Sequence, residues 1–372
     1  MHNNMKWYNI LNIDEIDSPS IVLYEDHLKH NLNTMITMVD NDLSKLMPHI
    51  KTNKMPKVIR QMITLGIKSF KTATIAEAEI AAVEGATHVL IAHQLVGPKV
   101  MRFIELIKTF KNTRFSTIVD NIDSAKKLHH EAVKHAINIH IYIDINNGMD
   151  RSGIEIGIGL ENLIEQIDKC LSLNFLGFHV YDGHLRTPDF KQRKDRVEEG
   201  FKNITTFFET LKHKYPNIEI ISGGTPSFTS HLTEKDRICS PGTCILWDWG
   251  YDQKLTEQEY KYAALVITRV ISKPKKNVIT IDLGHKAIAS ENPIDNRVKF
   301  LNLFDYELIS QSEEHGVLSV QNWNDIKVGD VLYGVPYHIC PTINLYDEVS
   351  VIVHSKKIDS WDITARKRKI TI

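Results

Sequence analysis

The stretch "THVLIAHQLVGPKVMRFIELIKTF", residues 87–110, decides the fold. Residues 87–95 form a short, mostly apolar run that is typical of a buried β-strand. Residues 98–110 then space their apolar side chains as one face of an amphipathic helix does. A strand followed closely by a helix is one βα unit, so the stretch predicts a parallel sheet covered by helices.

The same alternation continues on both sides of this stretch. Further strands are predicted at 67–74, 114–121, 137–145, 174–183 and 218–222, and further helices at 74–85, 122–135 and 190–215. A βα unit that recurs about every 25 residues over roughly 230 residues predicts a (β/α)8 barrel of the TIM type. A doubly wound open sheet is the alternative.

The sequence changes character after about residue 255. Short β-rich runs separated by turns replace the alternation, and no helix-length period appears. This pattern predicts an antiparallel β domain at the C-terminal end. We therefore expect a barrel over residues 15–250, and a second domain that combines residues 1–14 with 251–372.

Composition excludes several classes of protein. The 372 residues carry a formal net charge of −1, which favours neither nucleic acid nor an anionic membrane as a partner. No apolar run approaches the ~20 residues of a membrane span, and residues 1–20 lack the apolar core of a secretory signal. The four cysteines form no CxxC pair. We expect a cytoplasmic protein without disulfides.

Chemically active residues follow the predicted strands, where barrel enzymes place their sites. Lys51, Arg151, Tyr181 and His184 all stand after such strands, as does the turn Gly223-Gly224-Thr225. Glycine-rich turns expose N–H groups that can hold a phosphate. A lysine can form a Schiff base with an aldehyde cofactor, and an arginine can hold a phenolate oxygen. Together these residues predict a site for pyridoxal 5′-phosphate.

The proposed lysine lies in "LMPHIKTNKMP", residues 46–56, between a short apolar strand and an amphipathic helix. Lys54 is the rival Schiff-base lysine in this stretch. Because lysines at helix starts are usually exposed, we expect Lys54 to be a surface charge.

A second pair of residues suggests a metal site. In the run His338-Ile339-Cys340, an extended strand would place the imidazole and the thiol on the same side. Imidazole and thiolate together suit Zn²⁺, and two protein ligands leave positions open for water or substrate. Mn²⁺ and Mg²⁺ are the alternative metals. Buried small residues without a ligand role are the other explanation of this pair.

Several motifs resemble the D-threonine aldolase and D-serine dehydratase family of fold-type III pyridoxal enzymes, which have an alanine-racemase-like barrel. The resemblance runs from about residue 18 to the C-terminus. The motifs that carry it are "PHIKTNK", "ATIAEAE", "INNGMDRSGI", "YDGHLR", "SGGTPSF", "SPGTCILWD", "DLGHKAIASENP", "SEEHG" and "PYHICPTINLYD".

The resemblance implies a role for each of the residues singled out above. Lys51 would carry the cofactor, although Asn53 replaces the second histidine of the family's lysine motif. The other implied roles are Arg151 at the cofactor's ring oxygen, Tyr181 against the pyridine ring, Gly223, Gly224 and Thr225 at the phosphate, and His338 and Cys340 at a metal. Pro226 departs from the family, which often has glycine there. The family also implies a homodimer.

Three functions remain open. The first is retro-aldol cleavage of a D-3-hydroxy amino acid, such as D-threonine to glycine and acetaldehyde, with His184 or a metal-bound hydroxide as the base. The second is β-elimination from D-serine or a related substrate, with Lys51 removing the α-proton. The "YDGHLR" and "GMDRSGI" motifs look closer to aldolases, whereas His-x-Cys looks closer to dehydratases. The third, a non-catalytic pyridoxal-binding barrel, is disfavoured because such proteins lack the extra β domain.

Overall fold

The computed structural model describes residues 6–372, and the first five residues of the N-terminal stretch considered above lie outside them. The chain forms two compact units. The barrel unit comprises Ile36–Gly242 and Lys367–Ile372, and the β unit comprises the described residues through Met35 and Thr243–Arg366. The predicted boundaries lie at residues 14 and 250, whereas the compact units change at residues 35 and 242. The assignment of domains stays a prediction.

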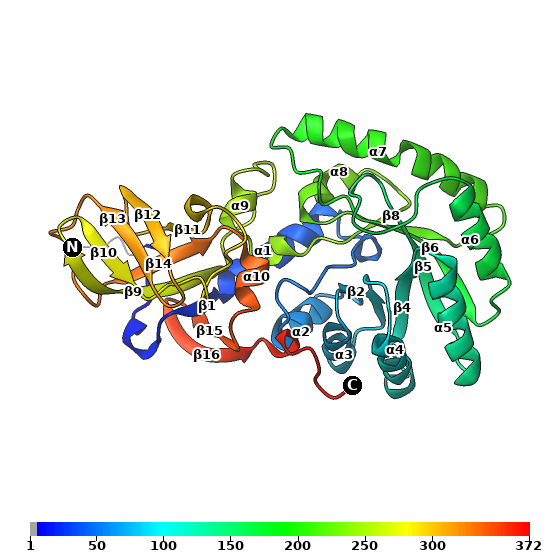
Figure 1. The fold of residues 1–372 in the computed structure, drawn as a ribbon, viewed down its shortest axis with the longest axis horizontal. Helices are drawn as coiled ribbons and strands as arrows, with labels where there is room; N and C mark the ends of the chain where they lie inside the picture. Colours follow the sequence, from blue (N-terminus) through cyan, green and yellow to red (C-terminus); the bar gives the residue numbers. More distant parts are fainter. Residues whose placement is uncertain (1–5) are drawn as a thin grey trace. The chain divides into compact units, whose positions relative to one another are not determined.

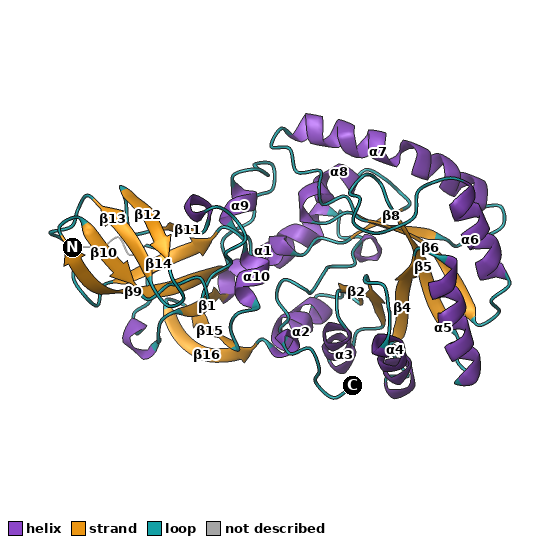
Figure 2. Ribbon diagram, in the orientation of Figure 1, coloured by secondary structure: helices purple, strands orange, loops and turns teal. Residues whose placement is uncertain are grey.

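The barrel unit is built on a parallel sheet with its strands in chain order (Figure 1). Its strands are β2 (Ser69–Thr72), β3 (His88–Ile91), β4 (Arg114–Val119), β5 (Ile139–Ile145), β6 (Leu173–Val180), β7 (Glu219–Ser222) and β8 (Arg237–Cys239). The helices of this unit are α2 (Pro56–Thr64), α3 (Ile75–Val83), α4 (Pro98–Thr109), α5 (Ile122–Lys134), α6 (Ile158–Asp168), α7 (Phe190–Leu211) and α8 (Phe228–His231). Figure 2 shows helices outside the curled sheet.

Residues 46–50 join the two edges of this sheet. The backbone N–H of Met47 donates to the carbonyl of Cys239 in β8 at 2.9 Å, and the N–H of Ile50 donates to the carbonyl of Lys71 in β2 at 3.0 Å. Leu46 and His49 form parallel bridges to the same two strands. The sheet therefore closes on itself, and the prediction of an alanine-racemase-type barrel is confirmed. An open doubly wound sheet is excluded because its edges would stay apart.

Apolar side chains fill the interior of the barrel. Met47, Leu90, Ile118, Tyr142 and Ile221 form one buried cluster, and each is at most 2% exposed. They come from the closing segment and from β3, β4, β5 and β7. This apolar cluster fills the interior of the barrel, and the polar side chains of the site lie at the ends of the strands.

The β unit is a mostly antiparallel sheet, as predicted. Its order is β12-β13-β10-β9-β1-β15-β16, and β14 pairs with both β9 and β11. Only β1 and β15 pair in parallel among the strands described for this unit. The strands are β1 (Ser20–Tyr24), β9 (Ala264–Lys275), β10 (Val278–Ile281), β11 (Val298–Phe300), β12 (Tyr306–Gln311), β13 (Gly316–Val320), β14 (Val331–Pro336), β15 (Glu348–Val353) and β16 (Lys356–Asp362). Its helices are α1 (Glu25–Met38), which extends into the barrel unit, α9 (Trp249–Asp252) and α10 (Ile339–Ile343).

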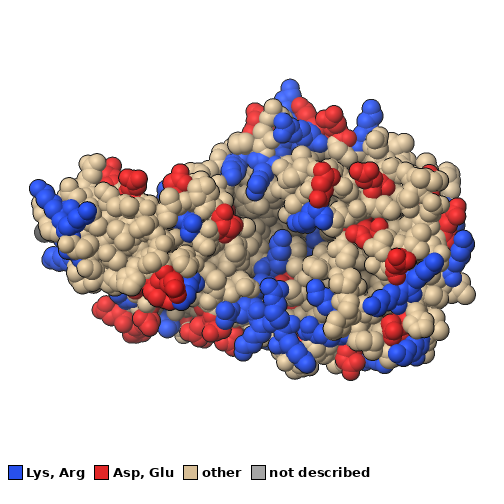
Figure 3. Space-filling view, viewed as in Figure 1, with Lys and Arg blue, Asp and Glu red and all other residues tan. Residues whose placement is uncertain are grey.

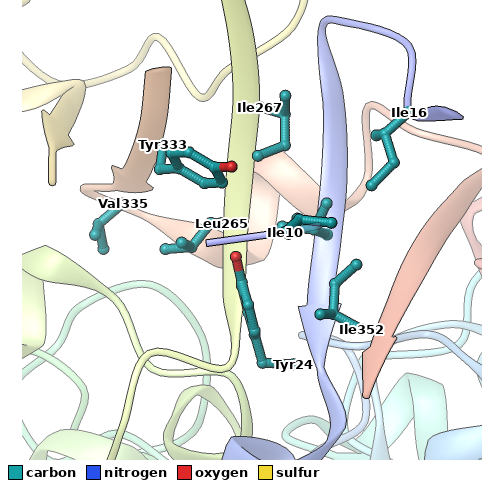
Figure 4. Packing of buried hydrophobic residues seen from close by; sticks show 9 residues of the cluster. Ile10, Ile16, Tyr24, Leu265, Ile267, Tyr333, Val335 and Ile352 are labelled. Carbon is teal, nitrogen blue, oxygen red and sulfur yellow. The ribbon is translucent and has the colours of Figure 1, made fainter. Parts of the chain in front are cut away.

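A compact apolar core holds the β unit together (Figure 4). Side chains of β1, β9, β14 and β15 meet there with residues that precede β1, including Ile10 and Ile16. Their burial removes apolar surface from water, which is the main favourable contribution to folding.

The face shown in Figure 3 carries both Lys and Arg side chains and Asp and Glu side chains, each in several groups. No helix within residues 6–372 combines the length and the apolar character that a membrane crossing requires.

Candidate functional site

Lys51 stands in the turn that follows the closing segment of the barrel. The next two residues, Thr52 and Asn53, are fully buried, and the Asn53 side chain accepts a hydrogen bond from the backbone N–H of Met55 at 3.1 Å. Asn53, which replaces the family's histidine, therefore shapes the approach to helix α2. Lys51 itself remains partly exposed and lines a cavity.

The expectation for Lys54 was wrong. Its side chain is buried, and its Nζ lies 2.5 Å from Oε1 of Glu77, whose carboxylate is fully buried. The other carboxylate oxygen of Glu77 accepts the N–H of Ala73 at 2.7 Å, while Thr74 caps helix α3. Lys54 is buried because its ammonium group pairs with this carboxylate. The two residues are far apart in the sequence, so the sequence pattern around Lys54 does not reveal the pair. The pairing removes Lys54 as a rival for the cofactor.

A cavity of about 400 Å³ opens at the carboxyl ends of the barrel strands. It brings together three of the predicted site residues, Lys51, Arg151 and Tyr181. It does not include His184 or the Gly223–Thr225 turn among its lining residues. The lining residues are His49, Lys51, Lys71, Ala73, Ala92, His93, Gln94, Arg151, Ser152, His179 and Tyr181.

The ring of Tyr181 is the centre of a cationic group. Lys51 Nζ lies 5.7 Å from the ring centroid, Lys71 Nζ lies 5.3 Å from it, and the Arg151 guanidinium carbon lies 5.0 Å from it. A Cβ added to Gly183 would come within 2.2 Å of the Tyr181 hydroxyl, and one added to Gly224 would come within 3.1 Å of its Cε2. These two glycines thus leave the space that the ring occupies.

The glycine turns after β7 and β8 are tightly packed. Gly223 has a φ of +63°, and a Cβ there would lie 2.7 Å from Ser227 Oγ. A Cβ on Gly242 would lie 2.7 Å from the carbonyl oxygen of His49. The Thr225 hydroxyl accepts the N–H of Gly242 at 3.0 Å, which ties the two turns together. Glycine is required at both turns because neighbouring protein atoms occupy the space that a side chain would need.

A buried network of hydrogen bonds holds the Gly223–Thr225 turn in place. Asp182 accepts hydrogen bonds from Ser227 and from His231 Nε2, the latter at 2.8 Å. Arg237 donates to His231 Nδ1 at 3.0 Å. Burial alone would raise the pKa of Asp182, but His231 and Ser227 outweigh it and lower the pKa. The carboxylate therefore stays ionised and holds the turn in place.

Sequence reasoning missed a hydrogen-bonded pair, His179 and Asp144, of which His179 lines the cavity. His179 Nδ1 lies 2.7 Å from Asp144 Oδ1, and the other oxygen of Asp144 accepts from Gln94 and Ser152, both at 2.9 Å. Burial opposes ionisation of Asp144, yet these hydrogen bonds lower its pKa. Burial, and then the charge of Lys71, lower the pKa of His179. His179 is thus a neutral imidazole that donates from Nδ1, and its Nε2 has no partner within residues 6–372.

Lys71 was also missed. Its side chain, in strand β2, is 2% exposed, and its Nζ has no hydrogen-bond partner in the described part of the chain. Burial, followed by the neighbouring charge of Lys51, lowers the pKa of Lys71 to about 7. Alternation along "SFKT" could have shown that Lys71 and Ser69 share one face of the strand, but not that this face is the cavity.

His184 lies near the predicted arginine loop. A Cβ on Gly148 would be 3.9 Å from His184 Nε2, and the Nδ1 of His184 is buried without a partner in the described residues. Its role as a base stays a prediction.

The metal-ligand pair belongs to the β unit, and its expected geometry was wrong. His338 precedes helix α10 and Cys340 lies in its first turn, so the two residues are not in an extended strand. Their side chains nevertheless hydrogen-bond. Burial opposes protonation of His338, but Cys340, Asp248 and Glu291 raise its pKa to about 9. Within residues 6–372 no group of three or more His, Cys, Asp or Glu side chains is arranged to hold a metal ion.

Comparison with known protein families accounts for both units. The model described as "Alanine racemase, N-terminal domain" matches residues 24–246, more than half of the chain. The chain belongs to this family. A second model, described as "Putative serine dehydratase domain", matches residues 263–352, which include His338 and Cys340.

Relatives of this chain match it over nearly its whole length. It is 23% identical to a D-threonine aldolase from Arthrobacter sp., with 94% of this chain and 93% of the relative covered. It is 25% identical to a 3-hydroxy-D-aspartate aldolase from Paracoccus denitrificans (strain Pd 1222), with 95% and 92% covered. The crystal structure of a D-threonine aldolase from Filomicrobium marinum superposes with a TM-score of 0.85 at 25% identity, covering 97% of this chain and 98% of the other. The chain is therefore related to enzymes of the lyase kind.

Proposed function

We propose that this chain is a pyridoxal 5′-phosphate-dependent lyase that cleaves D-3-hydroxy amino acids by a retro-aldol reaction, as a D-threonine aldolase does. The observation that carries the proposal is the convergence of Lys51, Arg151 and Tyr181 on one cavity. The likeness to two aldolases over more than 90% of each chain supports it.

The residues of the barrel fit the cofactor. An amine, a guanidinium and an aromatic ring line the cavity, and the glycines of the Gly223–Thr225 turn have no side chains to cover their backbone N–H groups. The cofactor, when bound, supplies an electron sink for the bond that breaks at the α-carbon. We assign Lys51 as the residue that bonds to it, Arg151 to its ring oxygen, Tyr181 to its ring face, and the Gly223–Thr225 turn to its phosphate.

The chain must also move a proton. Retro-aldol cleavage removes the proton of the β-hydroxyl and delivers one to the α-carbon. His184 remains the predicted base, and His179 is a second candidate because it is neutral, lines the cavity and has an unpartnered Nε2. A neutral imidazole can accept a proton at such an atom. Asp144 fixes the tautomer and would stabilise the cation that forms.

A divalent metal is part of the proposal. The thiol of Cys340 and the imidazole of His338 are donors that suit Zn²⁺, and Thr243 Oγ1 lies 3.2 Å from the sulfur. Mn²⁺ and Mg²⁺ are the alternatives. A bound metal supplies Lewis acidity, which lowers the pKa of a hydroxyl.

Dehydration of D-serine is the second candidate. The match of residues 263–352 to the dehydratase domain model favours it. In that reaction Lys51 would take the α-proton, and the β-hydroxyl would leave as water. The two candidates share the site, so their products must distinguish them.

Product analysis tests the proposal. Purified protein loaded with pyridoxal phosphate and Zn²⁺ is incubated separately with D-threonine and with D-serine. We expect glycine and acetaldehyde from D-threonine. A 2-keto acid and ammonia from D-serine, without glycine from D-threonine, would favour the dehydratase, and no product from either would refute both. We also propose that the protein is cytoplasmic and forms a homodimer. Size-exclusion chromatography with light scattering checks the oligomeric state.

A further inference from the structure

The cavity is lined by cationic side chains that come from separate parts of the barrel. Lys51, Lys71 and Arg151 line it, and no Asp or Glu belongs to its described lining. The carboxylate of Asp144 already accepts hydrogen bonds from three residues of the lining, Gln94, Ser152 and His179. These cations favour an anion that enters the cavity.

Two of the three cations already have a task under the proposed function. Lys51 would bond to the cofactor, so its amine would not be available to a substrate carboxylate. Arg151 has five N–H donors in a fork, which suffice for the ring oxygen and an adjacent carboxylate. Lys71 has neither a task nor a hydrogen-bond partner in the described chain. A buried ammonium without a partner costs free energy, so an anionic ligand that reaches it would be stabilised there.

We infer that Lys71 binds the second carboxylate of a dicarboxylic D-3-hydroxy amino acid, so that the preferred substrate is of the 3-hydroxyaspartate type. The inference rests on the proposed function. Lys71 Nζ lies 5.3 Å from the Tyr181 ring centroid, and Lys51 Nζ lies 5.7 Å from the same point. A substrate held at Lys51 is therefore within reach of Lys71.

The reaction on this substrate balances. The Cα–Cβ bond of 3-hydroxyaspartate breaks, and the hydroxyl proton passes to the base. The electron pair remains at the α-carbon, which takes up a proton. The products are glycine and glyoxylate, with no oxidant or reductant. The distal carboxylate becomes the carboxylate of glyoxylate and stays opposite Lys71.

Binding at Lys71 predicts a pH dependence with a definite sign. Its pKa of about 7 means that the amine loses its proton as the pH rises through neutrality. A second carboxylate should then favour binding below this pH and lose its advantage above it. The charged and titratable groups that surround the amine are Lys51, Arg151, Asp144, Asp182, His49, His179 and Tyr181.

Binding measurements test the inference separately from turnover. D-aspartate and D-alanine lack the β-hydroxyl, so neither can undergo the cleavage, and calorimetric titration of the loaded protein compares their affinities. We expect D-aspartate to bind about 10–100-fold more tightly below pH 7, the range of a hydrogen bond to a charged group. At pH 8 its binding should take up more protons than that of D-alanine.

Variants of two nearby lysines complete the test. Lys71→Met should remove the preference for D-aspartate, and should lower the ratio of kcat/KM for D-3-hydroxyaspartate over D-threonine by about 10–100-fold. Lys68→Met is the matched control, because Lys68 is exposed at the approach to the same strand and should change neither ratio.

Two results would overturn the inference. The first is equal affinities for D-aspartate and D-alanine in the unmodified protein. The second is an equal loss of affinity for both ligands in Lys71→Met, which would assign Lys71 to the α-carboxylate. Absence of any cleavage would instead refute the proposed function, and the binding comparison would still decide the role of Lys71.

Discussion

Breaking the buried ion pair between Lys54 and Glu77 should destabilise the barrel strongly. The two side chains are 10% and 0% exposed and their charged atoms are 2.5 Å apart. Glu77→Gln keeps the shape and an acceptor for Ala73 N–H, but leaves the Lys54 charge buried without a carboxylate. Removing one partner of a buried pair costs about 3–5 kcal/mol. Because Lys54 follows Lys51 by three residues, the change should also weaken cofactor binding.

A second ion pair between the same helical regions is the matched control. Arg60 in helix α2 donates two hydrogen bonds to Glu84, just after helix α3, and the Arg60 side chain is 62% exposed. The Glu84 side chain is 6% exposed, but Glu84→Gln should cost less than Glu77→Gln, because the Arg60 guanidinium that it leaves without a carboxylate lies in water. The double variant Lys54→Met/Glu77→Gln should recover most of the loss, because no charge is then left buried.

The assay is urea unfolding followed by far-UV circular dichroism. Most helical residues lie in the barrel unit, so this signal reports on it. Tryptophan fluorescence is less suitable, because all five tryptophans lie in the β unit: Trp7, Trp247, Trp249, Trp323 and Trp361. If Glu77→Gln lowers the free energy of unfolding no more than Glu84→Gln does, the Lys54–Glu77 pair does not stabilise the turn that carries Lys51, and the reasoning is refuted.

Three further predictions follow from the site and the core. Borohydride reduction of the cofactor-loaded protein should attach the cofactor to Lys51; a label at Lys71 in the peptide map would contradict the assignment. Removal of metal by a chelator should abolish turnover, and added Zn²⁺ should restore it well in the unmodified protein and poorly in Cys340→Ala; full activity without metal would refute the metal site. Burial, and then the charge of Arg114, lower the pKa of His88 to about 3. Since an unfolded histidine titrates near ~6.5, stability should fall as the pH drops from about 6.5 toward 3, by up to about 1.4 kcal/mol per pH unit. Urea titrations of the protein and of His88→Gln across this range should show a shallower loss in the variant.

The sequence was sufficient for the barrel because each βα unit carries its own local signal. The apolar run and amphipathic helix of residues 87–110 need no distant partner to be recognised, and they correspond to β3 and α4. The segment that closes the barrel was harder to predict from the sequence. Residues 46–50 are too short to form a regular strand, and they join β8 to β2 only through partners that lie far along the chain.

The burial of individual lysines could not be predicted. Lys51, Lys54 and Lys71 look alike in the sequence. Lys51 is partly exposed at the cavity, Lys54 pairs with Glu77, and Lys71 is buried without a hydrogen-bond partner in residues 6–372. These differences depend on which side chains other elements bring to each amine. The His338–Cys340 pair was recognised by its chemistry, but the start of helix α10 at Ile339 gave it a different backbone geometry.

Glycine release from the four stereoisomers of threonine tests the central claim most directly. A lysine fixed at one strand end presents one face to the substrate, so a single α-configuration should react. Protein loaded with pyridoxal phosphate and Zn²⁺ should release glycine from D-threonine and D-allo-threonine at rates within about 10–200-fold of each other, because a pocket contact discriminates by that much. Lys51→Ala should release none. L-threonine cleaved at a rate comparable to the D-isomers, or glycine release that persists in Lys51→Ala, would contradict the account.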